Sequence, residues 1–557
     1  MHRDTLRKLL NIVVPYVLPL PALTAFALTD LAWLGWLAWA ASLGYLAWRY
    51  RLDGLGEQRL VRSLLVVAPL VGTRSAAPWV AGILIVGLTG VEPLLTAAAE
   101  TGRLRTRNLD VRRSLPQRMH DPRWPYLAQP VLLVGFAVTV GGGFASWPLL
   151  AGILAVTAIT GLFLGYAWLH RRTAHGHRHD PAVWQALVRH APRFAIHFSA
   201  PTGTEYHVGM WLPYLERLGL PYLVIVREAE CLAPMARLTG APVVLAPTMG
   251  HLEQVVPPGV TTCFYVNNAN PNVHMVRLAQ LTHVQLLHGD SDKASSYHPA
   301  TAMYDRIFVA GQAGIDRYAD HGVLIPEQKF AIVGRPQVSQ VRIDRRPIST
   351  VAQPTVLYAP TWAGWFDGMN YCSLSIGPAI VRGLLARGAT VICRPHPYTT
   401  RNQAAARQLA AVEQLLASDA ARTGRDHRWG DVTLRQMSLV DCMNAADAMV
   451  SDVTAVASDW LYSEKPFAIV DMTGQGERFA VTFPLARAAY VVDRTAGNLD
   501  RALDQLLDAD PLATTRREMK AYYLGDFPDK SYVDAFVAEA RRCVLGVREP
   551  AVAVPLA

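Results

Sequence analysis

Cysteine is scarce in this sequence, with six residues in a chain of 557 and no two spaced as a Cys-x-x-Cys pair. Zinc ribbons need paired thiolates, and small disulfide-bonded domains need a denser cysteine framework, so the sequence excludes both classes. It also lacks a Walker A motif, a His-Glu-x-x-His motif and a paired-aspartate motif where a metal-dependent glycosyltransferase would carry one. We therefore expect reduced thiols, no metal and no cofactor.

Acidic residues are scarce in the first third of the chain. Residues 1–180 contain 18 Lys and Arg against 9 Asp and Glu, whereas residues 181–557 contain 35 of each, so the whole net charge of +9 lies in the first third. A basic domain can bind nucleic acid, but this surplus lies between apolar segments, as the positive-inside rule describes. The pattern predicts a membrane protein with no nucleic-acid partner.

The apolar segments of this basic region are long enough to form membrane helices. They cover residues 9–28, 31–48, 76–99 and 126–169, the last being long enough for two passes. Residues 63–99 form either a hairpin or a re-entrant piece, because the first arm is short and is followed by Arg74, so we predict four to six spans. The arginine-rich connections are residues 3–8, 49–62, 103–123 and 171–178. If all face the cytosol, the chain is a multi-pass plasma-membrane protein with residues 181–557 in the cytosol.

Short β-branched runs alternate with helical patterns after residue 190, which is the rhythm of parallel α/β sheets. The first set of predicted strands comprises residues 193–198, 222–226, 243–246, 262–266, 284–287, 306–309 and 330–333. The second set comprises residues 355–358, 390–393, 448–450, 467–470 and 490–492. Residues 335–354 are rich in proline and arginine, which indicates a linker between two lobes. We therefore predict a helical transmembrane domain over residues 1–180 and two Rossmann-type lobes over residues 181–335 and 336–557.

Polar groups rich in Gly and Pro directly follow the predicted strands, where the ligand crevice of an open α/β sheet lies. They occupy residues 199–203, 288–290, 334–336, 359–362, 394–397 and 451–454. Because these groups come from both lobes, we expect them to converge on one cleft, which would be the active site.

Two histidines stand in such groups. His288, followed by Gly289, is a candidate general base, because glycine permits close backbone approach and imidazole accepts a proton near neutral pH. Arg394 and His396 stand in an Arg-Pro-His-Pro turn and suit phosphate oxygens. A structural role stays open for each group. His288 would then be a structural histidine at a strand end, and Arg394 a solvated arginine in a turn stiffened by proline.

Two further groups carry hydroxyls. Ser451, Asp452 and Thr454 precede a predicted helix, where free N–H groups and hydroxyls form an anion site for a pyrophosphate, although ordinary N-capping explains them as well. Thr361 and Trp362 end another strand, and the indole either stacks on a nucleotide base or packs between the lobes.

Taken in order, five motifs resemble the CDP-glycerol glycerophosphotransferase family, the teichoic-acid primases and polymerases. They are His288-Gly-x-x-x-Lys293, Gly334-x-Pro336, Tyr358-Ala-Pro-Thr-Trp362, His396-Pro397 and Ser451-Asp-x-Thr454. The resemblance covers residues 193–540. It implies a bacterial GT-B enzyme with a CDP-linked polyol donor, CMP as leaving group, a lipid-linked acceptor and no required metal.

The resemblance also implies roles for the candidate residues. By motif position, His288 is the base on the acceptor hydroxyl and His396 stabilises charge on the transferred phosphoryl group. Lys293, Arg394, Ser451, Asp452 and Thr454 are the expected donor-phosphate ligands. The first lobe would hold the acceptor and the second lobe the donor.

The sequence departs from the family pattern in ways that bear on the donor. Gln337 and Ala363 stand where the family often has arginine, and Asp290-Ser291 replaces its usual Thr-Pro. Membrane spans replace a peripheral amphipathic attachment. Two other functions therefore stay open: a GT-B glycosyltransferase that uses a nucleotide sugar for envelope polysaccharide, and a non-catalytic membrane scaffold that has kept the GT-B shell.

Overall fold

The computed structural model divides the chain into two compact units, which are described separately. The first unit comprises Met1–Arg105 and Asp110–Ala186, and the second comprises Thr106–Leu109 and Leu187–Ala557. The structure describes residues 14, 17–28, 31–54, 59–71, 73, 76–100, 104–112, 123–173, 180–364, 370–528 and 531–546. The predicted basic cluster at residues 3–8, residues 174–178 of the cluster at 171–178, Arg74 and residues 113–122 lie outside the described residues.

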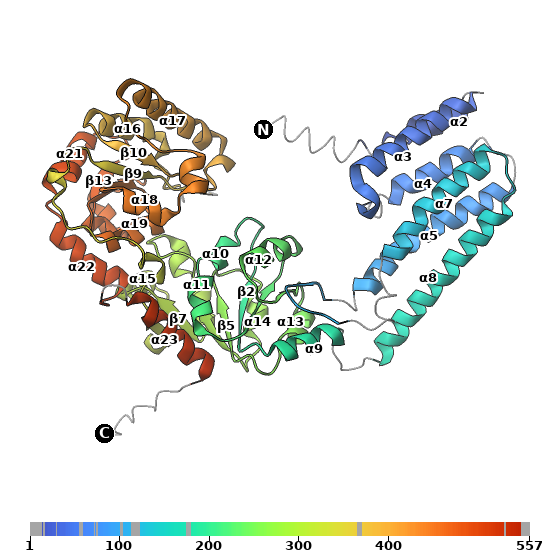
Figure 1. The fold of residues 1–557 in the computed structure, drawn as a ribbon, viewed down its shortest axis with the longest axis horizontal. Coiled ribbons are helices and arrows are strands. Elements are labelled where there is room, and N and C mark those ends of the chain that lie inside the picture. The colour runs from blue at the N-terminus through green and yellow to red at the C-terminus, as the bar shows by residue number, and fades with distance from the viewer. Residues whose placement is uncertain are drawn as a thin grey trace. The chain divides into compact units, whose positions relative to one another are not determined.

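The first unit is a bundle of helices (Figure 1). Its described helices are α2 (Leu20–Leu28), α3 (Ala32–Gly54), α4 (Arg59–Leu70), α5 (Ala76–Glu100), α7 (Arg123–Gly141) and α8 (Trp147–Thr173). Leu65, Phe136 and Ile153 contribute to its apolar core. A buried ion pair, Arg62 with Glu92, joins α4 to α5, and its Nη1–Oε1 distance is 2.8 Å.

Two stretches of this bundle, Ala76–Leu94 and Trp147–Tyr166, are long and apolar enough to cross a membrane. By contrast, α2 has 9 residues and α4 has 12, while a membrane span needs about 20. The predicted four to six spans are therefore not confirmed. Large apolar side chains nevertheless point outward: Val131, Trp147 and Leu162 are 70%, 72% and 75% exposed. Such an exposed apolar surface is unusual for a water-soluble domain.

The first lobe of the second unit is built on an eight-stranded sheet in the order β1-β4-β3-β2-β5-β6-β7-β8. Its strands are β1 (Thr106–Arg107), β2 (Phe194–Phe198), β3 (Tyr222–Val226), β4 (Val243–Leu245), β5 (Thr262–Tyr265), β6 (Thr282–Gln285), β7 (Arg306–Val309) and β8 (Phe330–Ile332). Its helices are α10 (Tyr206–Gly209), α11 (Leu212–Leu215), α12 (Leu232–Leu238), α13 (Met249–Val255), α14 (Asn272–Val276) and α15 (Gln312–Asp320). Helix α9 (Pro181–His190), which precedes β2, spans the boundary between the two units. Strands β2 to β8 are parallel, as predicted.

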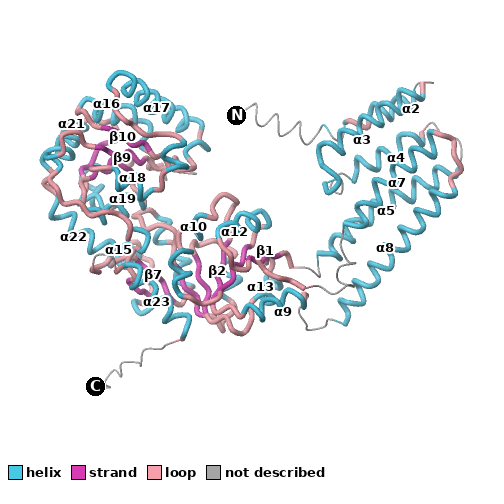
Figure 2. Tube along the Cα trace, in the orientation of Figure 1, coloured by secondary structure: helices cyan, strands magenta, loops and turns pink. Residues whose placement is uncertain are grey.

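The second lobe is built on a five-stranded parallel sheet in the order β10-β9-β11-β12-β13. Strands β9 and β10 of this sheet are labelled in Figure 2. Its strands are β9 (Thr355–Ala359), β10 (Thr390–Cys393), β11 (Ala448–Ser451), β12 (Phe467–Asp471) and β13 (Tyr490–Asp493). Its helices are α16 (Gly377–Ala386), α17 (Gln403–Thr423), α18 (Leu439–Ala445), α19 (Ala455–Trp460), α20 (Phe479–Thr482), α21 (Leu499–Asp504) and α22 (Ala513–Leu524). Two parallel α/β lobes confirm the predicted GT-B-like class of the soluble half.

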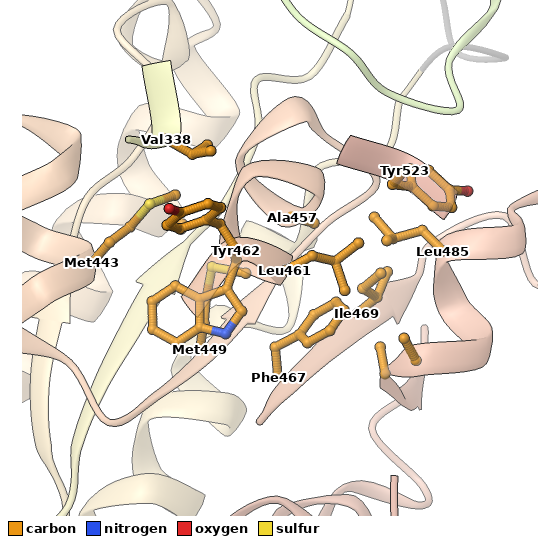
Figure 3. Packing of buried hydrophobic residues seen from close by; sticks show 14 of the residues in the cluster. Val338, Met443, Met449, Ala457, Leu461, Tyr462, Phe467, Ile469, Leu485 and Tyr523 are labelled. Atoms are coloured by element: carbon orange, nitrogen blue, oxygen red, sulfur yellow. The ribbon is translucent and has the colours of Figure 1, made fainter. Parts of the chain in front are cut away.

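Alternating side chains of the second sheet pack on opposite faces. Along β9, Tyr358 faces α16 and α17, whereas Leu357 faces α18 and α19. On the latter face Met449, Phe467 and Leu461 pack together (Figure 3). This double covering explains why the strands read as continuous apolar runs in the sequence.

The last helix, α23 (Tyr532–Leu545), returns to the first lobe. Phe536, Ala540 and Val544 recur every four residues and pack in the first lobe's core, because this spacing places them on one helix face. Thr261 Oγ1 donates a hydrogen bond of 2.6 Å to the Val544 carbonyl. The sequence analysis had assigned all of residues 336–557 to the second lobe. In the structure, α23 packs on the first lobe instead.

Strand β1 is the other unpredicted element. It comes from the connection between α5 and α7 and pairs antiparallel with β4, through Thr106 with Val244 and Arg107 with Val243. The Asn108 amide then donates to the Thr239 carbonyl at 2.7 Å. A short piece of the predicted transmembrane domain is therefore an edge strand of the first lobe.

Candidate active site

His288 is carried by a constrained turn after β6. Leu287, the residue before it, has φ +53°, a left-handed conformation that is uncommon for a non-glycine residue. The Trp211 indole donates to the Leu287 carbonyl at 2.7 Å, and the Leu287 N–H donates to Gln285 Oε1 at 3.0 Å. Unusual backbone conformations held in this way are frequent at functional sites.

The tautomer of neutral His288 follows from one hydrogen bond. Its Nδ1 lies 3.0 Å from the Val266 carbonyl oxygen, which can only accept, so Nδ1 carries the hydrogen. The lone pair of the neutral ring is then at Nε2. Burial lowers the pKa of His288, with a further lowering from Arg335, while the hydrogen bond to Val266 acts in the opposite direction. His288 is therefore neutral at pH 7 and can take a proton at Nε2.

Gly289 lies where the two lobes approach each other. A Cβ at this position would come within 3.1 Å of the Cβ of Ala455 at the start of α19. The small residue after His288 thus keeps the histidine next to the second lobe, which is the close approach that the sequence indicated.

His396 has the opposite tautomer. The Tyr398 N–H donates to His396 Nδ1 at 3.1 Å, so in the neutral ring the hydrogen is at Nε2. Burial lowers the pKa of His396 to about 4, with contributions from Lys293, His288 and Arg401. His396 is therefore a neutral hydrogen-bond donor at pH 7.

The predicted convergence of groups from both lobes is present around these histidines. His288 of the first lobe is close enough to affect the ionisation of His396 of the second, and Lys293 Nζ donates to Thr361 Oγ1 across the lobes at 3.0 Å. Trp362 and Tyr398 lie beside His396, with ring centroids 6.2 and 5.3 Å away. Among the described residues, no three His, Cys, Asp or Glu side chains are arranged to hold a metal ion.

The two lobes are also joined by buried polar contacts outside this group. Arg335 Nε lies 2.8 Å from Asp459 Oδ1 in a buried ion pair. The Asp292 carboxylate accepts hydrogen bonds from the Tyr523 hydroxyl at 2.8 Å and from the Leu485 N–H at 3.2 Å. These contacts fix the spacing of the groups that the lobes contribute.

Asp452 holds a turn of the second lobe. Its Oδ2 accepts the N–H groups of Thr361 at 2.7 Å and Ser373 at 3.2 Å. Burial raises the pKa of this carboxyl to about 6, against the lowering effect of these hydrogen bonds and of Lys293. Because an anionic carboxylate repels a phosphate, Asp452 fits a role in holding Thr361 and balancing Lys293 better than direct contact with a donor.

Lys293 is the cation of this network. It is half-buried, and its Nζ lies 5.3 Å from the centroid of the Tyr371 ring. Burial lowers its pKa to about 8, although Asp452 acts in the opposite direction. Lys293 is therefore largely charged at pH 7 and loses its charge within the range of ordinary enzyme assays.

Ser451 and Arg394, two other predicted phosphate ligands, have partners within the second lobe. Ser451 Oγ donates to the Ala359 carbonyl at 2.8 Å, and Arg394 Nη1 donates to the Met437 carbonyl at 2.8 Å. Thr454 precedes α19 without a side-chain capping bond. The Ser451 hydroxyl thus uses its hydrogen to join β11 to β9, a structural role that differs from the N-capping that the sequence left open.

Three residues of the site were missed by the sequence analysis. His207 of α10 stacks on His288, while Arg401 lies 3.6 Å from the centroid of the Tyr398 ring. These three residues, His207, Tyr398 and Arg401, belong to no recognisable motif, and the turns that carry them are irregular. Sequence alone offered no signal for these contacts.

A pocket of about 370 Å³ lies beside Lys293 and is lined by both lobes. Tyr297 comes from the first lobe, while Tyr371, Phe483, Asn370 and Gln475 come from the second. Aromatic faces and amide groups of this kind suit a flat heterocycle with polar edges.

Comparison with known families identifies the second lobe. Residues 338–473 match the profile of the family described as CDP-Glycerol:Poly(glycerophosphate) glycerophosphotransferase. This segment is therefore similar to that family over residues 338–473. The chain is accordingly a transferase, and the match includes His396 and the Ser451 to Thr454 turn, while His288 and Lys293 precede it.

Solved structures with a similar arrangement are distant in sequence. A variant of the wall teichoic acid polymerase TagF soaked with CDPG is 10% identical, with a TM-score of 0.42 over 64% of this chain and 89% of its own. A putative UDP-N-acetylglucosamine 2-epimerase from Listeria monocytogenes is 11% identical, with a TM-score of 0.44 over 64% of this chain and 98% of its own. No curated protein matches this chain in sequence. The similarity to the glycerophosphotransferase family therefore rests on residues 338–473.

Proposed function

We propose that this member of the family transfers a polyol phosphate, such as glycerol phosphate, from a CDP-activated donor to a lipid-linked or cell-envelope polymer acceptor. The observation that carries the proposal is the pair of histidines, one from each lobe, with opposite tautomers in one site. His288 offers a lone pair for the acceptor hydroxyl, and His396 offers an N–H to a phosphoryl oxygen.

The proposed reaction is a displacement at the donor's β-phosphorus. The acceptor oxygen forms a bond to this phosphorus while its proton passes to His288 Nε2. The bond between the phosphorus and the bridging oxygen breaks, and CMP leaves with the bonding electrons. His396 and Lys293 stabilise the negative charge on the phosphoryl oxygens, so catalysis rests on positioning and electrostatics.

The nucleoside of the donor would occupy the 370 Å³ pocket. Its base would lie among Tyr297, Tyr371 and Phe483, and its phosphates would reach Lys293, which is 5.3 Å from the Tyr371 ring. Thr361 and Trp362 would then border the phosphates rather than the base, because Thr361 is bonded to Lys293 and Trp362 lies beside His396.

A donor screen with purified protein in lipid tests this function. With labelled CDP-glycerol and a lipid-linked acceptor, we expect release of CMP and transfer of glycerol phosphate. Release of a nucleoside diphosphate from a nucleotide sugar would instead indicate glycosyl transfer. Absence of turnover with every donor, in folded protein, would support a scaffold.

Donor affinity should depend on the charge of Lys293. Because the pKa of Lys293 is lowered to about 8, the cation is present below that pH and is lost above it. The Kd for CDP-glycerol should therefore rise about tenfold between pH 7 and pH 9. At pH 7, Lys293→Met should weaken binding by about 1.5–3 kcal/mol, the usual value of a hydrogen bond to a charged group, and should remove this pH dependence. Calorimetric titration measures both effects.

Lys329→Met is the matched control for this measurement. Lys329 is also half-buried in the first lobe, but it donates to the carbonyls of Ala302 and Tyr304. Its loss should leave the Kd and its pH dependence unchanged. Equal donor affinity in Lys293→Met and the wild type would contradict a phosphate-binding role.

We also propose that the first unit lies in the plasma membrane with both catalytic lobes in the cytosol. The outward apolar side chains of α7 and α8 support lipid contact, Leu162 being 75% exposed. The pairing of β1 with β4 supports the orientation, because it ties the connection between α5 and α7 to the same side as the catalytic lobes. Helices α7 and α8 would then form a hairpin, as expected if four to six spans come in pairs.

Cysteine labelling tests the orientation. Arg112→Cys introduces a thiol between β1 and α7 in the chain, and Ala145→Cys introduces one between α7 and α8; both positions are exposed. With a membrane-impermeant maleimide, Ala145→Cys should react in intact cells, whereas Arg112→Cys should react only after permeabilisation. Five of the six native cysteines are buried, and Cys543 is partly buried, so the unaltered protein provides the background. Labelling of Arg112→Cys in intact cells would contradict the cytosolic location.

A further inference from the structure

His207 lies directly against the proposed base. It belongs to α10 and is 9% exposed. Its ring is stacked on that of His288, with centroids 3.7 Å apart and an interplanar angle of 8°. Its Nδ1 is buried without a hydrogen-bond partner among the described residues. A buried polar atom without a hydrogen-bond partner destabilises the fold, so a histidine at this position indicates a functional role.

We propose that His207 is a positioning residue that fixes the plane of the His288 ring, so that Nε2 is directed toward the acceptor hydroxyl. The inference rests on the proposed role of His288 as the base. The hydrogen bond from His288 Nδ1 to Val266 holds one ring atom, but it leaves the ring able to turn about that contact. A parallel ring at 3.7 Å restricts this rotation.

The stack also determines which of the two histidines takes the proton from the acceptor hydroxyl. Two imidazoles at this distance cannot both be charged without strong repulsion. Burial lowers the pKa of His207 to about 3, with further lowering from His288 and His396. His207 therefore stays neutral when His288 receives a proton, and the stack holds one cation at most.

Charged and titratable groups surround the stack on all sides. They are Tyr206 on α10, Arg335 beside His288, and Lys293, His396, Tyr398 and Arg401 around the facing histidine. The cations among them favour neutral imidazoles. Removal of His207 should therefore change the ionisation of His288 mainly by admitting water.

Two substitutions separate the effect of the flat ring from that of the imidazole nitrogens. His207→Ala should lower kcat by about 10- to 100-fold, with the KM for donor within twofold of wild type, because misplacement of a reacting group costs rate more than binding. Water would reach His288 and raise its pKa toward the ordinary value of about 6.5. The acidic limb of the kcat/KM profile should then move to higher pH. His207→Phe keeps a stacked ring and should recover kcat to within about threefold of wild type.

An independent readout follows the His288 ring itself. Titration of its Cε1–H signal by nuclear magnetic resonance should show a higher pKa in His207→Ala than in wild type and a smaller change in His207→Phe. His190→Ala is the matched control, since this half-buried histidine bonds the carbonyl of Tyr222 at the start of β3, whereas His288 follows the carboxyl end of β6. It should change neither the rate nor the His288 titration.

The outcomes distinguish this inference from the proposed function. If His288→Ala is inactive but folded His207→Ala has the wild-type rate and pH profile, the positioning role is overturned and the base is not. If His288→Ala retains full activity, the proposed function itself fails. In a His288→Ala background, His207→Ala should cause no further loss of rate, and an additional loss would show that His207 acts independently of His288.

Discussion

His288→Ala should lower kcat by about 10²- to 10⁴-fold while the Kd for CDP-glycerol changes by less than about threefold. The reason is that the proton moves only in the transition state, so loss of the base removes an interaction that the ground state does not use. Single-turnover transfer with labelled donor measures the chemical step, and calorimetric titration measures binding. A large rate loss with intact binding is the expected signature.

The pH dependence of the wild type follows from the same residue. Because burial lowers the pKa of His288, its basic form, and with it the activity, should persist below the ordinary histidine range and be lost only as pH falls through the lowered value. The residual rate of His288→Ala should lack this acidic limb. His190→Ala provides the matched control, and unchanged thermal unfolding shows that each variant is folded. Wild-type turnover by folded His288→Ala would contradict the mechanism.

The central strands of both lobes were predictable because they are buried on both faces. Runs such as residues 222–226 and 390–393 read as continuous apolar segments, and both were assigned with their observed ends. Strand β6 was placed two residues too late, since polar Thr282 and His283 begin it. His283 is buried by pairing with the Tyr265 hydroxyl at 2.8 Å, a long-range contact that local pattern cannot show.

The elements that were missed depend on distant partners. β1 has two residues and no strand pattern, and it exists because β4 offers an open edge. Helix α23 has an ordinary apolar stripe, but the sequence does not indicate which of the two lobes packs against that stripe. Its Phe536 packs with Trp211 of the first lobe, with ring centroids 5.1 Å apart.

The candidate site was predictable where strand ends carry it, since the carboxyl ends of parallel strands meet at one edge. This reasoning predicted that His288 and His396 share one region, and in the structure His288 is close enough to influence the pKa of His396. The side-chain partners were not predictable: Ser451 bonds a neighbouring strand, and Asp452 holds two backbone N–H groups. Both uses depend on atoms that become close only after the sheet has formed.

The two replacements of a frequent arginine also have structural explanations. Gln337, which replaces a frequent arginine, donates to the Met210 carbonyl at 3.4 Å, and Ala363 packs against the core of the second lobe. Neither residue supplies a charge for a phosphate. Lys293 and Arg401 are cations close enough to His396 to lower its pKa, so we expect them to carry more of the donor's charge.

His396→Ala should lower kcat by about 10²- to 10³-fold, the usual cost of removing one preorganised donor to a developing negative charge. The position of the hydrogen sharpens this prediction. Because the Tyr398 N–H occupies Nδ1 of His396, only Nε2 can donate to the phosphoryl group. The amide nitrogen of a glutamine extends about as far as Nε2, whereas that of an asparagine extends only as far as Nδ1.

The kcat of His396→Gln should therefore be at least about tenfold higher than that of His396→Ala, whereas the kcat of His396→Asn should be close to that of His396→Ala. Single-turnover rates at saturating donor measure this order, since both amides are uncharged and similar in polarity. Thermal unfolding controls for the Tyr398 N–H, which loses its partner in His396→Ala. A higher rate in His396→Asn than in His396→Gln would place the catalytic hydrogen at Nδ1 and overturn the assigned tautomer. Equal rates in the alanine variant and the wild type would remove His396 from the mechanism, because a donor to the transition state cannot be lost without cost.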